Sequence, residues 1–266
     1  MPMSDFIHKI KPASGFSLGL KELWQYRELL YFFTWRDIKV KYKQTWLGIA
    51  WALIQPLGLM LIFTFLFSKT WKIDTGKVVY PIFVLAGLIC WNLFSSAVSH
   101  AGESMIQNAH IINKIYFPRL IIPGSSILVA LFDFLMGFII FIIFCAVYQQ
   151  PVHWSAIVYF PAGILLLLTA ALGLGTFLAA LNVKYRDFRY TIPFLLQVLF
   201  FASQVVYPLH SIQQTWLQYL LAANPKNAAI ELFRLPLNGG EVNAVTLIIG
   251  LTSSLLLFIT GLFYLR

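Results

Sequence analysis

The sequence predicts an all-α membrane protein with six transmembrane helices, an N-terminal amphipathic interface helix and a re-entrant helical pair before the last span. Hydrophobic residues make up 59% of the 266 residues and charged residues only 11%, whereas soluble domains carry about 25% charged residues. Six stretches are long and apolar enough to cross about 30 Å of hydrocarbon as helices. They lie at 49–68, 80–99, 121–147, 156–181, 190–209 and 243–264.

The segment before the first span predicts a helix that lies on the membrane surface. Residues 1–48 form a cytoplasmic N-terminal region, and residues 49–266 form the transmembrane domain. Within residues 20–35, polar side chains recur at helical spacing and apolar ones cover the rest of the axis. The basic run RDIKVKYK follows, and Trp46 and Trp51 fall where an aromatic belt is expected. We assign to this interface helix Trp24, Arg27, Arg36 and Lys39.

Positive charge is distributed unequally between the two sides of the predicted bundle. Fourteen of the 19 Lys and Arg residues lie before the first span, in the second-to-third and fourth-to-fifth loops, or at the C-terminus. Because Lys and Arg accumulate in cytoplasmic loops, both termini are predicted to be cytoplasmic. The net charge of +9 is better explained by anionic lipid head groups beside the membrane than by nucleic acid.

The connection at residues 100–120 is longer than a tight helix hairpin requires. Residues 103–116 can form a short helix that Phe117-Pro118 ends, with Ile111 and Ile112 on an apolar side. Two interpretations stay open: a second interfacial helix, or a docking element for a cytoplasmic partner.

The connection before the last span predicts two re-entrant half-helices within residues 208–240. Its apolar pieces, TWLQYLLAA and AAIELFRLPL, are separated by Asn224-Pro225, and each is too short to span. Such broken segments are tolerated where they are buried in protein or line a cavity. Glu231 and Arg234 are three residues apart and share a helix face. We expect them to pair or to point into a water-filled path.

Asp133 is an acidic residue inside the third predicted span. An acid at the bilayer centre costs about 2.5–3.5 kcal/mol, so its side chain should face the bundle or a cavity. It is either a pathway or gating residue, or a structural acid in an interhelical hydrogen bond. Cys90 and Cys145 also lie within spans, where they serve as small packing residues.

Motifs for catalysis and nucleotide binding are missing from the sequence. It has no GxxxxGK[ST] loop, no GxSxG, no HExxH and no paired metal-ligand spacing. We therefore expect no catalytic residue, no metal and no cofactor bound by this chain.

Four stretches carry a resemblance to a known family. They are RDIKVKYKQTWLGIAWALIQPL at 36–57, NAHIINKIYFPRLIIPGSSI at 108–127, LNVKYRDFRYTIPFLLQVLFFASQVVYP at 181–208 and NPKNAAIELFR at 224–234. In this order and spacing they resemble the membrane (permease) subunit of bacterial polysaccharide ABC exporters, which are type-two ABC transporters. The resemblance covers about residues 20–265.

The resemblance implies a homodimer around a central channel in the bacterial cytoplasmic (inner) membrane. Two copies of a separate ABC ATPase subunit would use ATP and Mg, and the cargo would be a lipid-linked polysaccharide such as O-antigen, capsule or teichoic acid. Membrane lipids would be further partners, and nucleic acid would not.

The resemblance also implies roles for individual residues. A coupling helix at about 103–116 would meet the ATPase through Glu103, Asn108, Ile111, Ile112, Lys114 and Tyr116. Candidates for the channel or the re-entrant pair are Trp51, Asp133, Tyr207, Trp216, Glu231 and Arg234. One departure concerns Gln204, which stands where many relatives have proline in SPVxYP, and it leaves a kink at that point open.

Three other functions compete with polysaccharide export. They are export of a drug or small lipid by a type-two ABC transporter, catalysis by a membrane-embedded lipid-sugar enzyme, and a passive channel or structural membrane subunit.

Overall fold

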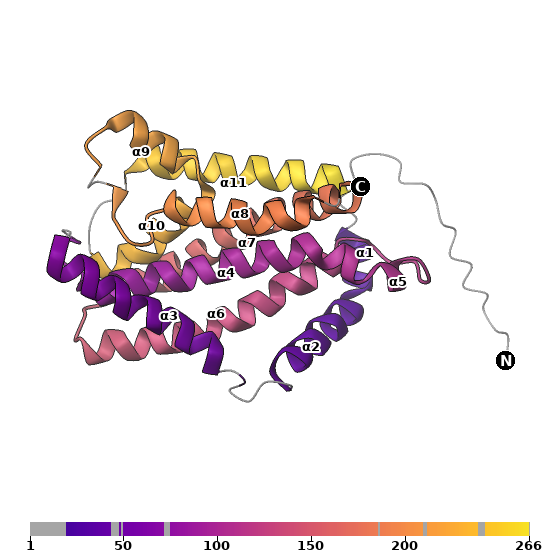
Figure 1. Cartoon of the computed structure of the whole chain (residues 1–266), viewed down its shortest axis with the longest axis horizontal. Helices are drawn as coiled ribbons and strands as arrows, with labels where there is room; N and C mark the ends of the chain where they lie inside the picture. Colours follow the sequence, from indigo (N-terminus) through magenta and orange to yellow (C-terminus); the bar gives the residue numbers. More distant parts are fainter. Residues whose placement is uncertain are drawn as a thin grey trace.

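The computed structural model describes residues 20–43, 48, 50–71, 75–185, 187–209, 212–238 and 243–265. The predictions for the N-terminal tail, for Trp46 and for Arg186 in the YRDxRY stretch fall outside the described residues. The chain forms an elongated helical bundle (Figure 1).

The described residues form helices and contain no strand. The order is α1 (Leu20–Gln25), α2 (Arg27–Lys43), α3 (Ala50–Phe63), the π-helix η1 (Thr64–Trp71), α4 (Tyr80–Gln107), α5 (Ala109–Ile112), α6 (Ile121–Val147), α7 (Ala156–Lys184), α8 (Phe188–Phe201), α9 (Thr215–Ala222), α10 (Pro225–Asn238) and α11 (Ala244–Leu265). Five are long and apolar enough to cross a membrane: α3 with the start of η1, α4, α6, α7 and α11. With the shorter apolar helix α8, they confirm an all-α membrane protein of about six spans.

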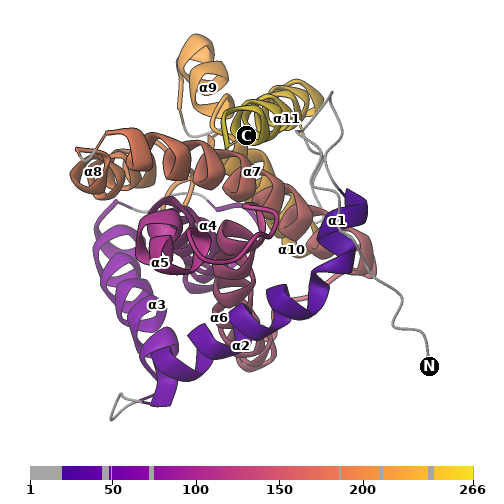
Figure 2. The same ribbon diagram turned by 90° about the vertical axis from the view of Figure 1, so that its right-hand side faces the viewer.

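The helix α4 is the centre of the bundle and packs against α3, α6, α7, α8 and α10 (Figure 2). In its most apolar 18-residue segment, 78% of the residues are buried, against 11% for α3. The chain by itself therefore covers α4 on most sides and leaves α3 open.

Predicted boundaries were wrong at the interface helix, at the end of the second span and at the 103–116 helix. The interface helix is two helices, α1 and α2, and α2 continues through the basic run to Lys43. The second span continues to Gln107 rather than ending at residue 99, so Glu103 belongs to α4 and the predicted 103–116 helix shrinks to α5. The Asn108 side chain donates to the Ser104 carbonyl at 2.9 Å, and this local bond competes with continuation of the helix.

The fifth span differs most from its prediction at 190–209. Helix α8 ends at Phe201 after 14 residues, which is roughly 21 Å at 1.5 Å per residue. Residues 202–209 continue without a regular helix, and most of them are buried.

Glycines bring α7 and α11 into backbone contact. A Cβ added to Gly261 would lie 2.0 Å from the Gly173 carbonyl oxygen and 2.6 Å from Thr176 Oγ1. Small residues at such crossings let membrane helices approach closely and gain van der Waals contact.

We expect Gly261→Val to separate α7 from α11. Overpacking typically costs about 1–3 kcal/mol, so the thermal midpoint in detergent should fall by several degrees, roughly 2–4 °C per kcal/mol. Gly58→Val on α3 is the control, because a Cβ there has nothing within 4 Å. Equal midpoints for the two variants would contradict the close crossing.

Candidate functional site

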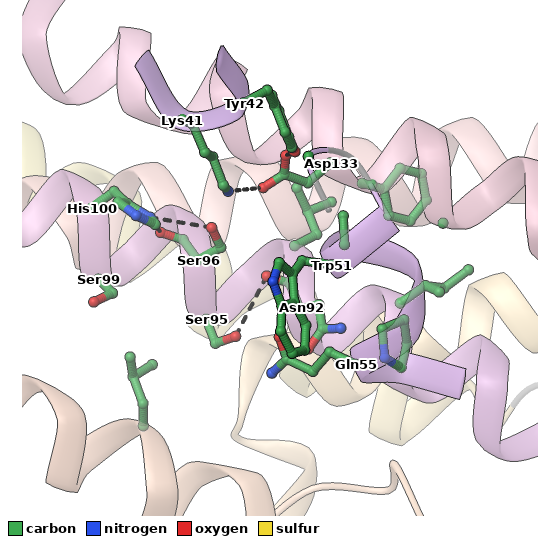
Figure 3. A pocket seen from close by; sticks show the side chains of 18 of the residues that line it. Lys41, Tyr42, Trp51, Gln55, Asn92, Ser95, Ser96, Ser99, His100 and Asp133 are labelled. Carbon is green, nitrogen blue, oxygen red and sulfur yellow. Dashed lines mark hydrogen bonds and ion pairs between the residues drawn. The ribbon is translucent and has the colours of Figure 1, made fainter. Parts of the chain in front are cut away.

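A groove of about 630 Å³ runs along the open side of α4 (Figure 3). Its walls come from the end of α2 and from α3, α4, α6 and α8. Its polar lining residues are Lys41, Tyr42, Trp51, Gln55, Asn92, Ser95, Ser96, Ser99, His100 and Asp133.

Five of these residues form a polar stripe on α4, which we define as Asn92, Ser95, Ser96, Ser99 and His100. They recur every three to four residues, so they share one helix face. The faces of α4 that pack inside the bundle carry apolar residues. The other long helices instead expose apolar side chains, such as Ile139 on α6 and Leu255 on α11. Because polar side chains are costly against lipid, the stripe fits a water-filled path or a second protein surface.

Asp133 joins α2 to α6 at the rim of this groove. Its carboxylate accepts hydrogen bonds from Lys41 Nζ and from the Tyr42 hydroxyl (Figure 3). Burial, together with the hydrogen bond to Asp133, raises the pKa of Tyr42, so this hydroxyl keeps its proton. The structure thus gives Asp133 an interhelical bond and also places it in the groove. A gating role stays a prediction.

A second polar assembly closes the broken end of α8. Where a helix stops, its last carbonyls lose their helical partners and must find others. Lys226 Nζ donates to the Leu199 carbonyl at 2.5 Å, and the Ser203 hydroxyl donates to the Phe200 carbonyl at 2.5 Å. The Tyr207 hydroxyl donates to the Phe201 carbonyl at 2.8 Å.

Arg234 satisfies the carbonyls beyond the break. Its guanidinium donates to Gln204 at 2.6 Å and to Val205 at 2.8 Å, and two of its nitrogens reach Phe83 on α4 at 2.7 and 3.1 Å. Only 6% of the Arg234 surface is exposed. A Cβ on Gly87 would lie 2.5 Å from the guanidinium, so this approach requires glycine.

Two asparagines complete this set. Asn224 Nδ2 donates to the Ala202 carbonyl at 3.2 Å, and the Gln204 backbone N–H donates to Asn227 Oδ1 at 3.2 Å. We call Asn224, Lys226, Asn227 and Arg234 the polar brace. They come from one turn and one helix, and together they hold residues 199–205.

Of the two alternatives predicted for Glu231 and Arg234, the ion pair was wrong, and a water-filled path stays a prediction. Ion pairs between described residues are Arg36–Asp37 and Lys41–Asp133. Glu231 instead faces α11, where the Thr246 hydroxyl lies 3.4 Å away. Although residues three apart are neighbours on a helix, Arg234 here binds carbonyls of α4 and of the segment after α8.

The structure separates the other predicted channel residues. Trp51 and Asp133 meet in the groove. Tyr207 and Arg234 hold the end of α8, while Trp216 projects from α9 with 68% of its surface exposed. The polar stripe on α4 was missed, although its spacing in the sequence could have revealed it.

The region around α5 lies at the other end of the bundle from α9 and α10, beside α1 and the end of α11 (Figure 1). Ile111 and Ile112 are half-buried against a cluster that contains Phe33. Ile115 and Tyr116 are instead 63% and 60% exposed. Lys114 is exposed as well.

The interface helix is tied to this same end. Arg36 on α2 donates to Asn108 Oδ1 at 3.1 Å. The Arg27 guanidinium lies 5.4 Å from the centre of the exposed Trp24 ring, and Lys39 Nζ lies 5.2 Å from that of Trp35. A cavity of about 740 Å³ opens beside α5, with Arg119 and Arg189 in its lining.

Residues 28–237 match the family described as ABC-2 type transporter. The chain belongs to this family. It is 32% identical over 207 residues to the O-antigen export system permease protein RfbA of Myxococcus xanthus, covering 77% of this chain and 78% of the relative. It is 26% identical over 235 residues to RfbA of Klebsiella pneumoniae, covering 88% and 90%. It is 27% identical over 203 residues to the polysialic acid transport protein KpsM of Escherichia coli, covering 75% and 77%.

In this ABC-2 type transporter the matched region includes α2 through most of α10. The groove and the polar brace therefore both lie within the part of the chain that identifies the family.

We expect Arg234→Gln to destabilise the bundle, because buried carbonyls left without donors cost about 1–3 kcal/mol each. The thermal midpoint in detergent should fall by at least roughly 5 °C, or the protein should fail to accumulate in membranes. Glu231→Gln is the control and should change the midpoint less, since its polar contact is long. Exchanging residues 231 and 234 should not restore stability, and a restored exchange variant would contradict the assignment.

We expect Asp133→Asn to loosen the end of α2 without unfolding the bundle. The Lys41 side chain is 37% exposed, so the pair is worth only about 1 kcal/mol. Amide hydrogen exchange over residues 36–43 should rise about fivefold to tenfold. Asp37→Asn, which breaks the pair with neighbouring Arg36, is the control. Unchanged exchange in Asp133→Asn would show that α2 is held by apolar packing alone.

Proposed function

We propose that this chain is the transmembrane subunit of an ABC exporter that moves lipid-linked polysaccharide across the cytoplasmic membrane with ATP hydrolysed by a separate subunit. The observation that carries the proposal is the polar stripe on α4, which opens into a groove inside an otherwise apolar bundle. A polymer of sugars needs hydrogen-bond donors and acceptors along its path. The names of the relatives, for O-antigen export and polysialic acid transport, point to the same cargo class.

A homodimer supports this function better than a single chain. The groove is open on one side, and α3 at its edge is mostly uncovered. A second copy facing the first would enclose the groove and shield polar groups from lipid. We therefore place the channel between two copies.

The ATPase is proposed to dock at the end that carries α5. Exposed Ile115 and Tyr116, next to exposed Lys114, offer an apolar contact with a positive neighbour. The link from Arg36 to Asn108 would connect movement of this end to the interface helix. In this arrangement α5 and both termini face the cytoplasm.

Export of a drug or small lipid is the alternative within the family. Sites for small apolar ligands are lined mostly by hydrophobic and aromatic side chains. The amides and hydroxyls along α4 favour a polar cargo instead.

Deletion of the gene tests the function directly. A deletion strain should lose surface polysaccharide and accumulate it inside the cell, and the wild-type gene should restore export. Unchanged surface polymer in the deletion strain would reject the proposed function.

Ile115→Asp combined with Tyr116→Ala should abolish co-purification with the ATPase subunit, because a buried unpaired charge at an interface is costly. The chain itself should reach the membrane in normal amounts, since both side chains are exposed. Trp154→Ala is the control, as this side chain is 89% exposed just before the start of α7, at the other end of the bundle. Normal ATPase binding and export by the double variant would place the docking surface elsewhere.

A further inference from the structure

The formal charges in the groove cancel. Among the described residues that line it, Lys41 and Asp133 carry formal charges, and they bind each other. The Tyr42 hydroxyl donates to the same carboxylate. His100 Nδ1 lies 2.7 Å from the Ser96 carbonyl oxygen. Among the described lining residues, the one Lys or Arg side chain is therefore that of Lys41, which has a partner carboxylate.

The rest of the groove lining combines neutral polar groups with nonpolar side chains such as Ile89 and Leu196. Gln55 on α3 lies near Asn92 on α4, and Ser95, Ser96 and Ser99 follow along α4 (Figure 3). Amides and hydroxyls both donate and accept, which suits the hydroxyl groups of a sugar. Trp51, with 56% of its surface exposed, adds a flat apolar ring beside them, and such rings pack against the apolar parts of polar molecules.

A polyanionic chain would need a different lining. Pores for anions and phosphate place Arg or Lys along the path. A cleft lined by charges of one sign concentrates ligands of the opposite charge. Drawing Lys41 toward a polyanion would leave the Asp133 carboxylate in the groove without its cation, and its charge would then repel the same polymer.

We infer that the groove carries uncharged, hydroxyl-rich glycan units and disfavours polymers with repeated carboxylate or phosphate groups. The inference rests on the proposed function and narrows its substrate class.

The first test is the composition of the exported polymer. The surface polysaccharide that disappears in the deletion strain is purified from the parent strain, and its repeat unit is analysed for carboxylates and phosphates. A repeat unit without charged groups supports the inference. A lost polymer with a charged repeat unit overturns the inference but leaves the proposed function intact. If no polymer is lost, both fail.

The second test adds charge of either sign at one position of the groove. In the complemented deletion strain, Gln55→Glu and Gln55→Lys should both lower export of surface polymer, to amounts within about twofold of each other, because an uncharged glycan does not distinguish the sign of the added charge.

The control for this test is Gln149→Glu, which adds the same charge as Gln55→Glu on an exposed loop after α6, outside the groove. Membrane abundance of each variant is measured by blot. Export at least tenfold lower in Gln55→Glu than in Gln55→Lys, at equal membrane abundance and with a normal control, would show that the cargo is anionic and overturn the inference.

Discussion

The constraint on which the structure depends is that every backbone carbonyl inside the membrane must have a donor. Helix α8 breaks at Phe201, within the predicted fifth span. The carbonyls that this break releases accept from side chains: Leu199 from Lys226, Phe201 from Tyr207, and Gln204 with Val205 from Arg234. Burial of the Arg234 guanidinium without an ion pair is costly, and its charge-assisted bonds to carbonyls offset that cost.

The same bonds set the position of the groove. Arg234 also binds the Phe83 carbonyl on α4, and Lys226 Nζ lies 3.9 Å from the centre of the Trp91 ring on that helix. Helix α10 thus joins the end of α8 to the centre of the bundle. Because α4 and α8 both line the groove, its width follows from how α10 holds them. Lys226 and Arg234, which hold α4 and α8 in position, are therefore not among the residues that line the groove.

The sequence predicted the structural features that depend on one local property. Apolar length predicted the five long helices, and the Asn224-Pro225 break separates α9 from α10 as expected. Hydrogen bonds between residues that are far apart in the sequence were not predicted. Proline is absent at Gln204, yet α8 already ends at Phe201. Beyond this end the Gln204 N–H binds Asn227 and the Gln204 carbonyl binds Arg234. No local pattern contains these partners, which lie 23 and 30 residues away.

The placement of Arg234 and Asp133 shows why spacing alone misassigned the charges. Helical spacing suggested Glu231 as the partner of Arg234. A guanidinium, however, has five donors, and those of Arg234 bind the Gln204 and Val205 carbonyls beyond the end of α8. Asp133 was considered only within its own span, whereas its partners Lys41 and Tyr42 lie more than 90 residues earlier in the sequence. Both residues are thus fully engaged in holding helices together. The other groove residues are amides, hydroxyls, His100, Trp51 and nonpolar side chains, so the chain combines a strongly positive composition with a path whose described lining residues have no net formal charge.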